Sequence, residues 1–177
     1  MINYDKILFM KKLTIKLILG LLLSLLFTIP SFGELNIKTG DVMIEQNSTI
    51  EPFKLNDQFG EEHNIEQMPK LMICSFGKES GKLISSYFNA QDSNYLSTHN
   101  IKLMADVSGV PSLLRKTIIL PKMKKYGFKI LVSTESDFMK QFPSKEDMLT
   151  IFKIDNGVVQ EVVFVADEAK LKEVIEG

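Results

Sequence analysis

The sequence predicts an α/β fold with a central mixed sheet, helices on its flanks and a β-hairpin before it. Three observations support this prediction. Strand-like and helix-like segments alternate through residues 71–142, which is typical of parallel strands joined by helices. Two strand-like runs and a helix follow in residues 149–175, and a hairpin pattern precedes the alternation in residues 53–65. Both ends of the chain should therefore add antiparallel strands to a parallel centre.

The first predicted element is the hairpin at residues 53–65. Apolar and polar residues alternate from Phe53 into the turn-forming residues 57–60, and residues 63–65 return. Before it, residues 34–48 are polar with a short apolar group, which indicates a loop or a short strand.

A strand, a loop and a helix are predicted next. Residues 71–76 form a continuous apolar run of the length expected for a buried parallel strand. Gly77 should end it, with Glu79 and Ser80 capping the following helix. The apolar residues of that helix recur at helical spacing along one face: Leu83, Ile84, Tyr87 and Phe88.

Two more strands are predicted in the middle of the chain, at residues 101–107 and 129–133. A short helix between them passes through residues 113–118, and Pro121 is expected to close or kink it. Residues 136–142 are predicted as a short helix or turn.

The last predicted elements are a second hairpin and a C-terminal helix. Residues 149–154 and 158–165 are rich in β-branched residues, and Asn156-Gly157 between them is the strongest short hairpin signal. Residues 167–175 then have the pattern of a helix.

Residues 1–33 have the pattern of a cleavable signal peptide. Residues 10–16 are basic, and residues 17–29 form an apolar run that is too short to cross a bilayer. Small residues follow at Ser31 and Gly33, so we expect cleavage after Gly33 and export to the periplasm or an equivalent compartment.

Two alternatives concern this N-terminus. Translation could start at Met10, which two lysines follow, and the apolar run could remain as an uncleaved anchor. Pro30 and the small residues end the run abruptly, which favours cleavage. Residues 34–177 would then form a single domain with 17 basic and 21 acidic residues, a net charge of −4 that argues against a nucleic-acid partner.

The order of elements resembles the thioredoxin fold, with Phe152-Lys153 and Gly157 placed where that fold has its β-hairpin. The opening pattern Phe53-x-Leu55-x-Asp57-Gln58-x-Gly60 is similar to the N-terminal hairpin of peroxiredoxins, Sco proteins and TlpA-like periplasmic thioredoxins. Within the superfamily, the loop Gly77-Lys78-Glu79-Ser80-Gly81-Lys82 resembles that of exported YtfJ-type proteins, to which no reaction is assigned.

The sequence departs from the redox members of this superfamily at two places. Their Cys-x-x-Cys motif follows the first parallel strand, where residues 77–82 contain no cysteine. Their cis-proline precedes the facing hairpin strand, and that position counts to Asp147. The resemblance therefore implies the fold without disulfide exchange.

Cys74 is the single cysteine of the chain, so no internal disulfide forms. It lies within the apolar strand, before the helix N-terminus that would activate a thiol, which predicts a buried and inert side chain. The alternative is a one-cysteine peroxidase or redox sensor that uses Cys74 as its catalytic residue.

Two loops are candidate ligand sites, and no cofactor is expected. Residues 77–82 do not have the spacing of a phosphate loop, but helix amides beside lysines could hold a small anion, with Gly77, Lys78, Ser80, Gly81 and Lys82 as binding residues. Ser108 and Gly109 follow another parallel strand, at an edge where open α/β sheets bind ligands. The favoured interpretation of Ser108 is nevertheless a helix cap.

A metal site is not predicted, because a Sco-type copper site needs two cysteines. The histidines His63 and His99 with the single Cys74 fall short of that ligand set. Four methionines lie in strand-like apolar runs that indicate core positions: Met43, Met72, Met104 and Met148.

The expected function is that of a thioredoxin-like accessory or binding protein of the cell envelope, whose partner is an envelope protein or a small anionic ligand. A single-cysteine redox enzyme and a Sco-like metallochaperone are the two alternatives. We expect that the protein is not an enzyme and that it contacts the membrane only through an uncleaved signal peptide.

Overall fold

The computed structural model describes residues 43–177. The predicted signal peptide, its cleavage after Gly33 and the alternative start at Met10 lie outside the described residues. Residues 43–177 belong to one compact unit that contains the whole sheet and both of the core clusters described below. Residues 43–177 therefore contain their own hydrophobic core, as a segment that folds by itself requires.

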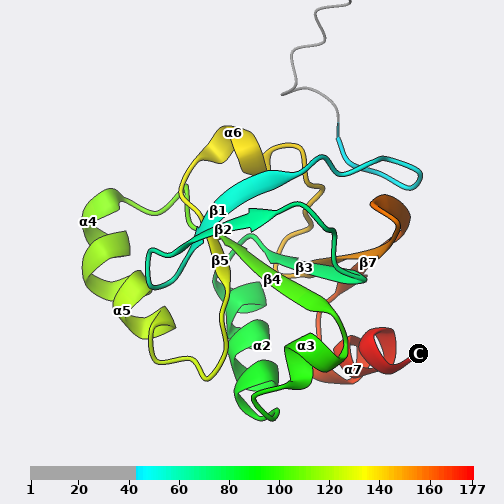
Figure 1. Cartoon of the computed structure of the whole chain (residues 1–177). Coiled ribbons are helices and arrows are strands. Elements are labelled where there is room, and N and C mark those ends of the chain that lie inside the picture. Colours follow the sequence, from blue (N-terminus) through cyan, green and yellow to red (C-terminus); the bar gives the residue numbers. More distant parts are fainter. Residues whose placement is uncertain (1–42) are drawn as a thin grey trace, which may run out of the picture. The chain divides into compact units, whose positions relative to one another are not determined.

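The unit is built on one seven-stranded mixed sheet (Figure 1). The strand order is β2-β1-β5-β4-β3-β6-β7, with β3, β4 and β5 parallel and the remaining pairs antiparallel. Their bounds are β1 Phe53–Asp57, β2 Glu62–Ile65, β3 Leu71–Ser75, β4 Ile101–Asp106, β5 Leu131–Ser133, β6 Leu149–Asp155 and β7 Val158–Val165. The predicted sheet, including the hairpin that precedes it, is confirmed.

The helical elements are α2 Lys78–Asn89, α3 Tyr95–Thr98, α4 Ser112–Leu114, the π-helical turn η1 Arg115–Ile119, α5 Leu120–Met123, α6 Ser136–Met139 and α7 Glu168–Glu176. The sequence predicted all of these regions except α3 and α5. No helix within residues 43–177 has the length and apolar character needed to cross a membrane.

The two faces of the sheet carry separate core clusters. Side chains alternate along β3, so that Ile73 packs with α2 and α7 on one face while Cys74 packs on the other. Helix α2 contributes Ile84 and Phe88 to the first cluster. The second cluster lies under α6 and the chain that precedes β1 (Figure 1). Burial on both faces explains why β3 is apolar from Leu71 to Cys74.

The C-terminal hairpin turns at Asn156 and Gly157, which both have positive φ angles, as the Asn-Gly pair predicts. Helix α7 begins after Asp167, whose carboxylate accepts a hydrogen bond from the amide of Lys170 at 2.8 Å.

Several local predictions need correction. The N-cap of α2 is Gly77, and Ser80 takes part in the capping from the third helical position, whereas Glu79 pairs with Lys82 instead. Pro111 is the N-cap of α4, so Ser108 caps no helix. Pro121 does not close its helix, which continues to Met123 after the π-helical turn. A π-helical turn shifts the backbone hydrogen bonds by one residue. The helix can then continue past Pro121 without the hydrogen bond that a proline, which has no N–H group, cannot donate.

The four methionines predicted as core divide into two groups. Met72 and Met104 are buried, as expected, whereas Met43 is largely exposed and Met148 is half-buried. Met43 precedes the sheet, where no second layer covers it.

Candidate functional site

The two loops singled out from the sequence lie beside one pocket. Strands β3 and β4 are adjacent and parallel, so the loops that follow them meet at the same edge of the sheet. A cavity of about 430 Å³ opens there. It is lined by most of the predicted binding residues, namely Gly77, Lys78, Gly81, Lys82, Ser108 and Gly109. The pocket is therefore the candidate ligand site.

Ser80, the remaining predicted binding residue, does not line the pocket. Its side chain is 1% exposed, and its hydroxyl accepts a hydrogen bond from the Gly77 amide at 3.1 Å. The same hydroxyl lies 3.2 Å from the Gly77 carbonyl, to which it can donate. Ser80 therefore fixes the loop between β3 and α2 and occupies the Gly77 amide, so it supports the loop that borders the cavity.

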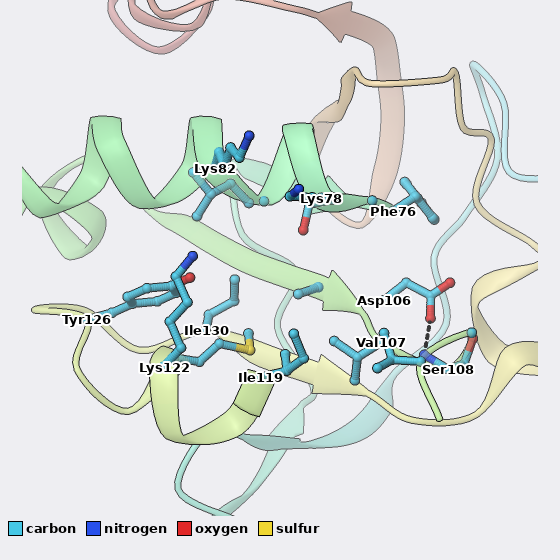
Figure 2. A pocket seen from close by; sticks show the side chains of 18 residues that line it. Phe76, Lys78, Lys82, Asp106, Val107, Ser108, Ile119, Lys122, Tyr126 and Ile130 are labelled. Carbon is cyan, nitrogen blue, oxygen red and sulfur yellow. Dashed lines mark hydrogen bonds between the residues drawn. The ribbon is translucent and has the colours of Figure 1, made fainter. Parts of the chain in front are cut away.

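Three lysines surround the pocket. Lys78 and Lys82 come from α2, and Lys122 comes from α5 on the opposite side, where Figure 2 shows its amino group extending toward α2. Lys82 pairs with Glu79 at 2.7 Å. Within residues 43–177, neither Lys78 nor Lys122 has a carboxylate within 4.0 Å, so both charges are available to a ligand.

The interior of the pocket is apolar. Its lining includes Ile84, Val107, Ile119, Met123 and Ile130, which join the core cluster that α2 covers (Figure 2). Tyr126 stands at the side of the pocket, and burial raises the pKa of its phenol, opposed by a hydrogen bond with Ser85. The phenol is thus neutral at physiological pH, and the positive charge of the site comes from lysines alone.

The acidic residue of the pocket, Asp106, is engaged in its own loop. Its carboxylate accepts a hydrogen bond from the Ser108 amide at 2.8 Å (Figure 2). The loop is fixed further by Arg115, whose guanidinium donates to the Val107 carbonyl at 3.2 Å. Ser108 and Gly109 therefore sit in a turn that Asp106 and Arg115, the first residue of η1, hold in place.

Sequence reasoning missed one wall of the pocket, formed by Ile119, Lys122, Met123 and Tyr126. Their spacing of three to four residues places them on one helical face, which was the available signal.

Cys74 does not line the pocket, although the next residue, Ser75, does, because the Cys74 side chain packs on the other face of the sheet. Its side chain is completely buried in the middle of β3, beside Met104 of β4 and Thr150 of β6. Burial raises the pKa of the thiol far above its ordinary value, so the sulfur remains protonated at neutral pH. The thiol is neither accessible nor activated in the folded protein.

The position of the expected cis-proline also differs from a redox site. Asp147 precedes β6 by two residues and has a φ of +60°, and every peptide bond within residues 43–177 is trans.

The side chains considered for a metal site do not meet. His99 lies 3.0 Å from the carbonyl of Tyr95 through its Nδ1 atom, while Cys74 is enclosed in the sheet. His63 instead approaches Asp57 and Glu61 across the first hairpin turn, a cluster that sequence reasoning missed. The ammonium of Lys129 lies 3.4 Å from Asp57 and also pairs with Glu61, so the charge a metal would bring is already present.

No protein-family profile and no curated protein sequence matches this chain. Solved structures do resemble it. A candidate thiol:disulfide interchange protein DsbE from Chlorobium tepidum superposes with a TM-score of 0.52 at 15% identity, covering 75% of this chain and 94% of that one. The peroxidoxin BcpB from Mycobacterium tuberculosis gives a TM-score of 0.51 at 14% identity, covering 75% and 95%.

A candidate protein disulfide isomerase from Bacteroides thetaiotaomicron is also similar, with a TM-score of 0.50 at 11% identity, covering 75% of this chain and 87% of that one. At these identities the likeness is one of fold. The chain thus has a thioredoxin-like fold, as the sequence predicts, and its function must be argued from its own residues.

Proposed function

We propose that this protein is a thioredoxin-like binding protein of the bacterial cell envelope that performs no disulfide exchange. One observation carries the proposal: the loop between β3 and α2, where the redox motif of the superfamily would lie, contains glycines and lysines and borders a pocket. The chain's only thiol is enclosed in the sheet. The signal-peptide pattern of residues 1–33 and the YtfJ-like loop support the envelope location.

The composition of the pocket favours a small organic anion with an apolar body. Lys78 and Lys122 supply two unpaired positive charges, and the buried lining supplies apolar surface for the remainder of the ligand. Sites of this size that combine apolar walls with a few polar groups are typical small-molecule sites. We propose no cofactor and no catalytic residue.

The absence of redox activity is testable with residues 34–177. We expect no turnover in an insulin-reduction assay with dithiothreitol, and no labelling of Cys74 by a maleimide mass tag until urea unfolds the chain. The Cys74→Ala variant should be as inactive as the wild type. Turnover by the wild type that this variant loses would instead establish the single-cysteine redox enzyme.

Ligand binding is testable with decanoate as the probe, measured by calorimetry. Because exposed ion pairs contribute up to about 1 kcal/mol each, Lys78→Ala and Lys122→Ala should each weaken binding about threefold. Lys70→Ala removes the same charge from a lysine outside the pocket and should leave affinity unchanged. Decanol should bind more weakly than decanoate. Equal loss in all three variants, or no preference for the anion, would contradict the proposed site.

A further inference from the structure

The helical segment of residues 112–125, which comprises α4, η1 and α5, exposes an unusual amount of apolar surface. Leu113 is 73% exposed, Leu114 45% and Ile118 56%. These are three of the five large apolar side chains that residues 43–177 leave exposed. Figure 1 shows α4 and α5 at the periphery of the unit, with α2, α3 and α7 grouped elsewhere.

The same segment is strongly basic. It contains no acidic residue and five basic ones: Arg115, Lys116, Lys122, Lys124 and Lys125. No carboxylate within residues 43–177 lies within 4.0 Å of any of the four lysines. Residues 34–177 together carry a net charge of −4, so positive charge is concentrated here in an otherwise acidic domain.

The inward side of the segment is well anchored. Met123 is buried, and Ile119 and Leu120 are half-buried against the core cluster under α2. The guanidinium of Arg115 reaches the Val107 carbonyl. The inward positions of the segment are already occupied by these side chains. The exposed apolar residues therefore have no place left to pack against their own domain.

We propose that residues 112–125 dock on an anionic lipid surface, which departs from the sequence-based expectation that only an uncleaved signal peptide would contact the membrane. Leu113, Leu114 and Ile118 would enter the boundary between headgroups and acyl chains, while the exposed Lys116, Lys124 and Lys125 contact lipid phosphates, as in other interfacial basic segments. Charge complementarity selects this occupant. A second copy of the chain would bring five like charges against five, whereas an anionic bilayer neutralises them and accepts the apolar side chains.

Docking in this way would place the pocket beside the lipid. Ile119 and Lys122 belong to both the segment and the pocket lining. The docking itself does not depend on the proposed binding function, because Leu113, Leu114 and Ile118 do not line the pocket.

The test is co-sedimentation of residues 34–177 with vesicles of phosphatidylglycerol and phosphatidylcholine, compared with vesicles of phosphatidylcholine alone. This chain omits the predicted signal peptide, whose apolar run would bind lipid by itself. We expect sedimentation only with the anionic vesicles, and a decline as salt is raised.

Two variants separate the apolar and charged contributions. Leu113→Ser combined with Ile118→Ser should weaken vesicle binding at least about tenfold, since it removes most of the inserted apolar area. Lys116→Ala combined with Lys124→Ala should weaken it about thirtyfold, at about 1 kcal/mol for each lysine near the surface. All four positions are exposed, so circular dichroism should remain that of the wild type.

The matched controls are Phe59→Ser, an exposed aromatic residue on the hairpin, and Lys70→Ala; both should bind vesicles as the wild type does. Equal binding to both kinds of vesicle, or equal loss in the controls, would overturn the proposal. The proposal would also be overturned if the wild type is a dimer in gel filtration and the variant with Leu113→Ser and Ile118→Ser is a monomer. That result would identify a second copy as the occupant. Decanoate binding by the same variant reports separately on the pocket.

Discussion

Asp57 is the residue that ties the first hairpin to the sheet. Its buried carboxylate accepts hydrogen bonds from the amides of Phe59 at 2.8 Å and Glu61 at 3.1 Å. It also lies 3.0 Å from the His63 ring and 3.4 Å from the Lys129 ammonium. Burial alone would raise the pKa of this carboxyl, but these partners outweigh burial and lower it to about 2.

This pKa predicts how stability depends on pH. Because the folded pKa lies below the ordinary value of 3.8, the stabilisation is complete above about pH 5 and is lost as pH falls toward 2. Asp57→Asn should lower the free energy of unfolding by about 2 kcal/mol at pH 7 and by much less at pH 2.5. Urea unfolding at both pH values measures the difference. A deficit that stays constant with pH would show that ionisation of Asp57 contributes nothing.

Ser80 acts at the scale of the element, because it orders the start of α2. Its hydroxyl bonds the Gly77 amide inside the protein, where no water replaces it. Ser80→Ala should therefore lower the free energy of unfolding by about 1 kcal/mol. Ser144→Ala, at an exposed position, should change it by less than about 0.5 kcal/mol. Equal urea midpoints for the two variants would rule out this role for Ser80.

Strands and hairpins were predictable because their signals are local. Alternation marked β1, a continuous apolar run marked β3, and Asn156-Gly157 marked the turn between β6 and β7. Helix ends were less predictable. Ser80 looks like a cap from its residue type, yet it binds back to Gly77 from the third position of the helix, and only the three-dimensional path of the chain decides between the two.

Pro121 shows the same limit. Proline normally ends a helix, but here the π-helical turn before it shifts the hydrogen-bond register, and Met123 keeps the end of the segment anchored in the core. That anchoring is a long-range contact, which no local pattern reports.

At the scale of the whole molecule, topology made part of the site predictable. Each of the loops containing Lys78 and Ser108 was a separate candidate from the sequence, and the structure brings them together because adjacent parallel strands have their carboxyl ends at one edge. The wall with Lys122 and Tyr126 was not predicted, because its position depends on how α5 docks against the sheet. The depth of Cys74 was predictable from its strand, since a parallel strand between two helical layers is buried on both faces.

The enclosure of Cys74 has a further consequence for the exported protein that we propose. An accessible single thiol on a secreted protein would form mixed disulfides with other proteins. Here the sheet must open before the sulfur meets any oxidant. The rate at which the Cys74 thiol reacts under native conditions therefore measures how often the centre of the sheet opens.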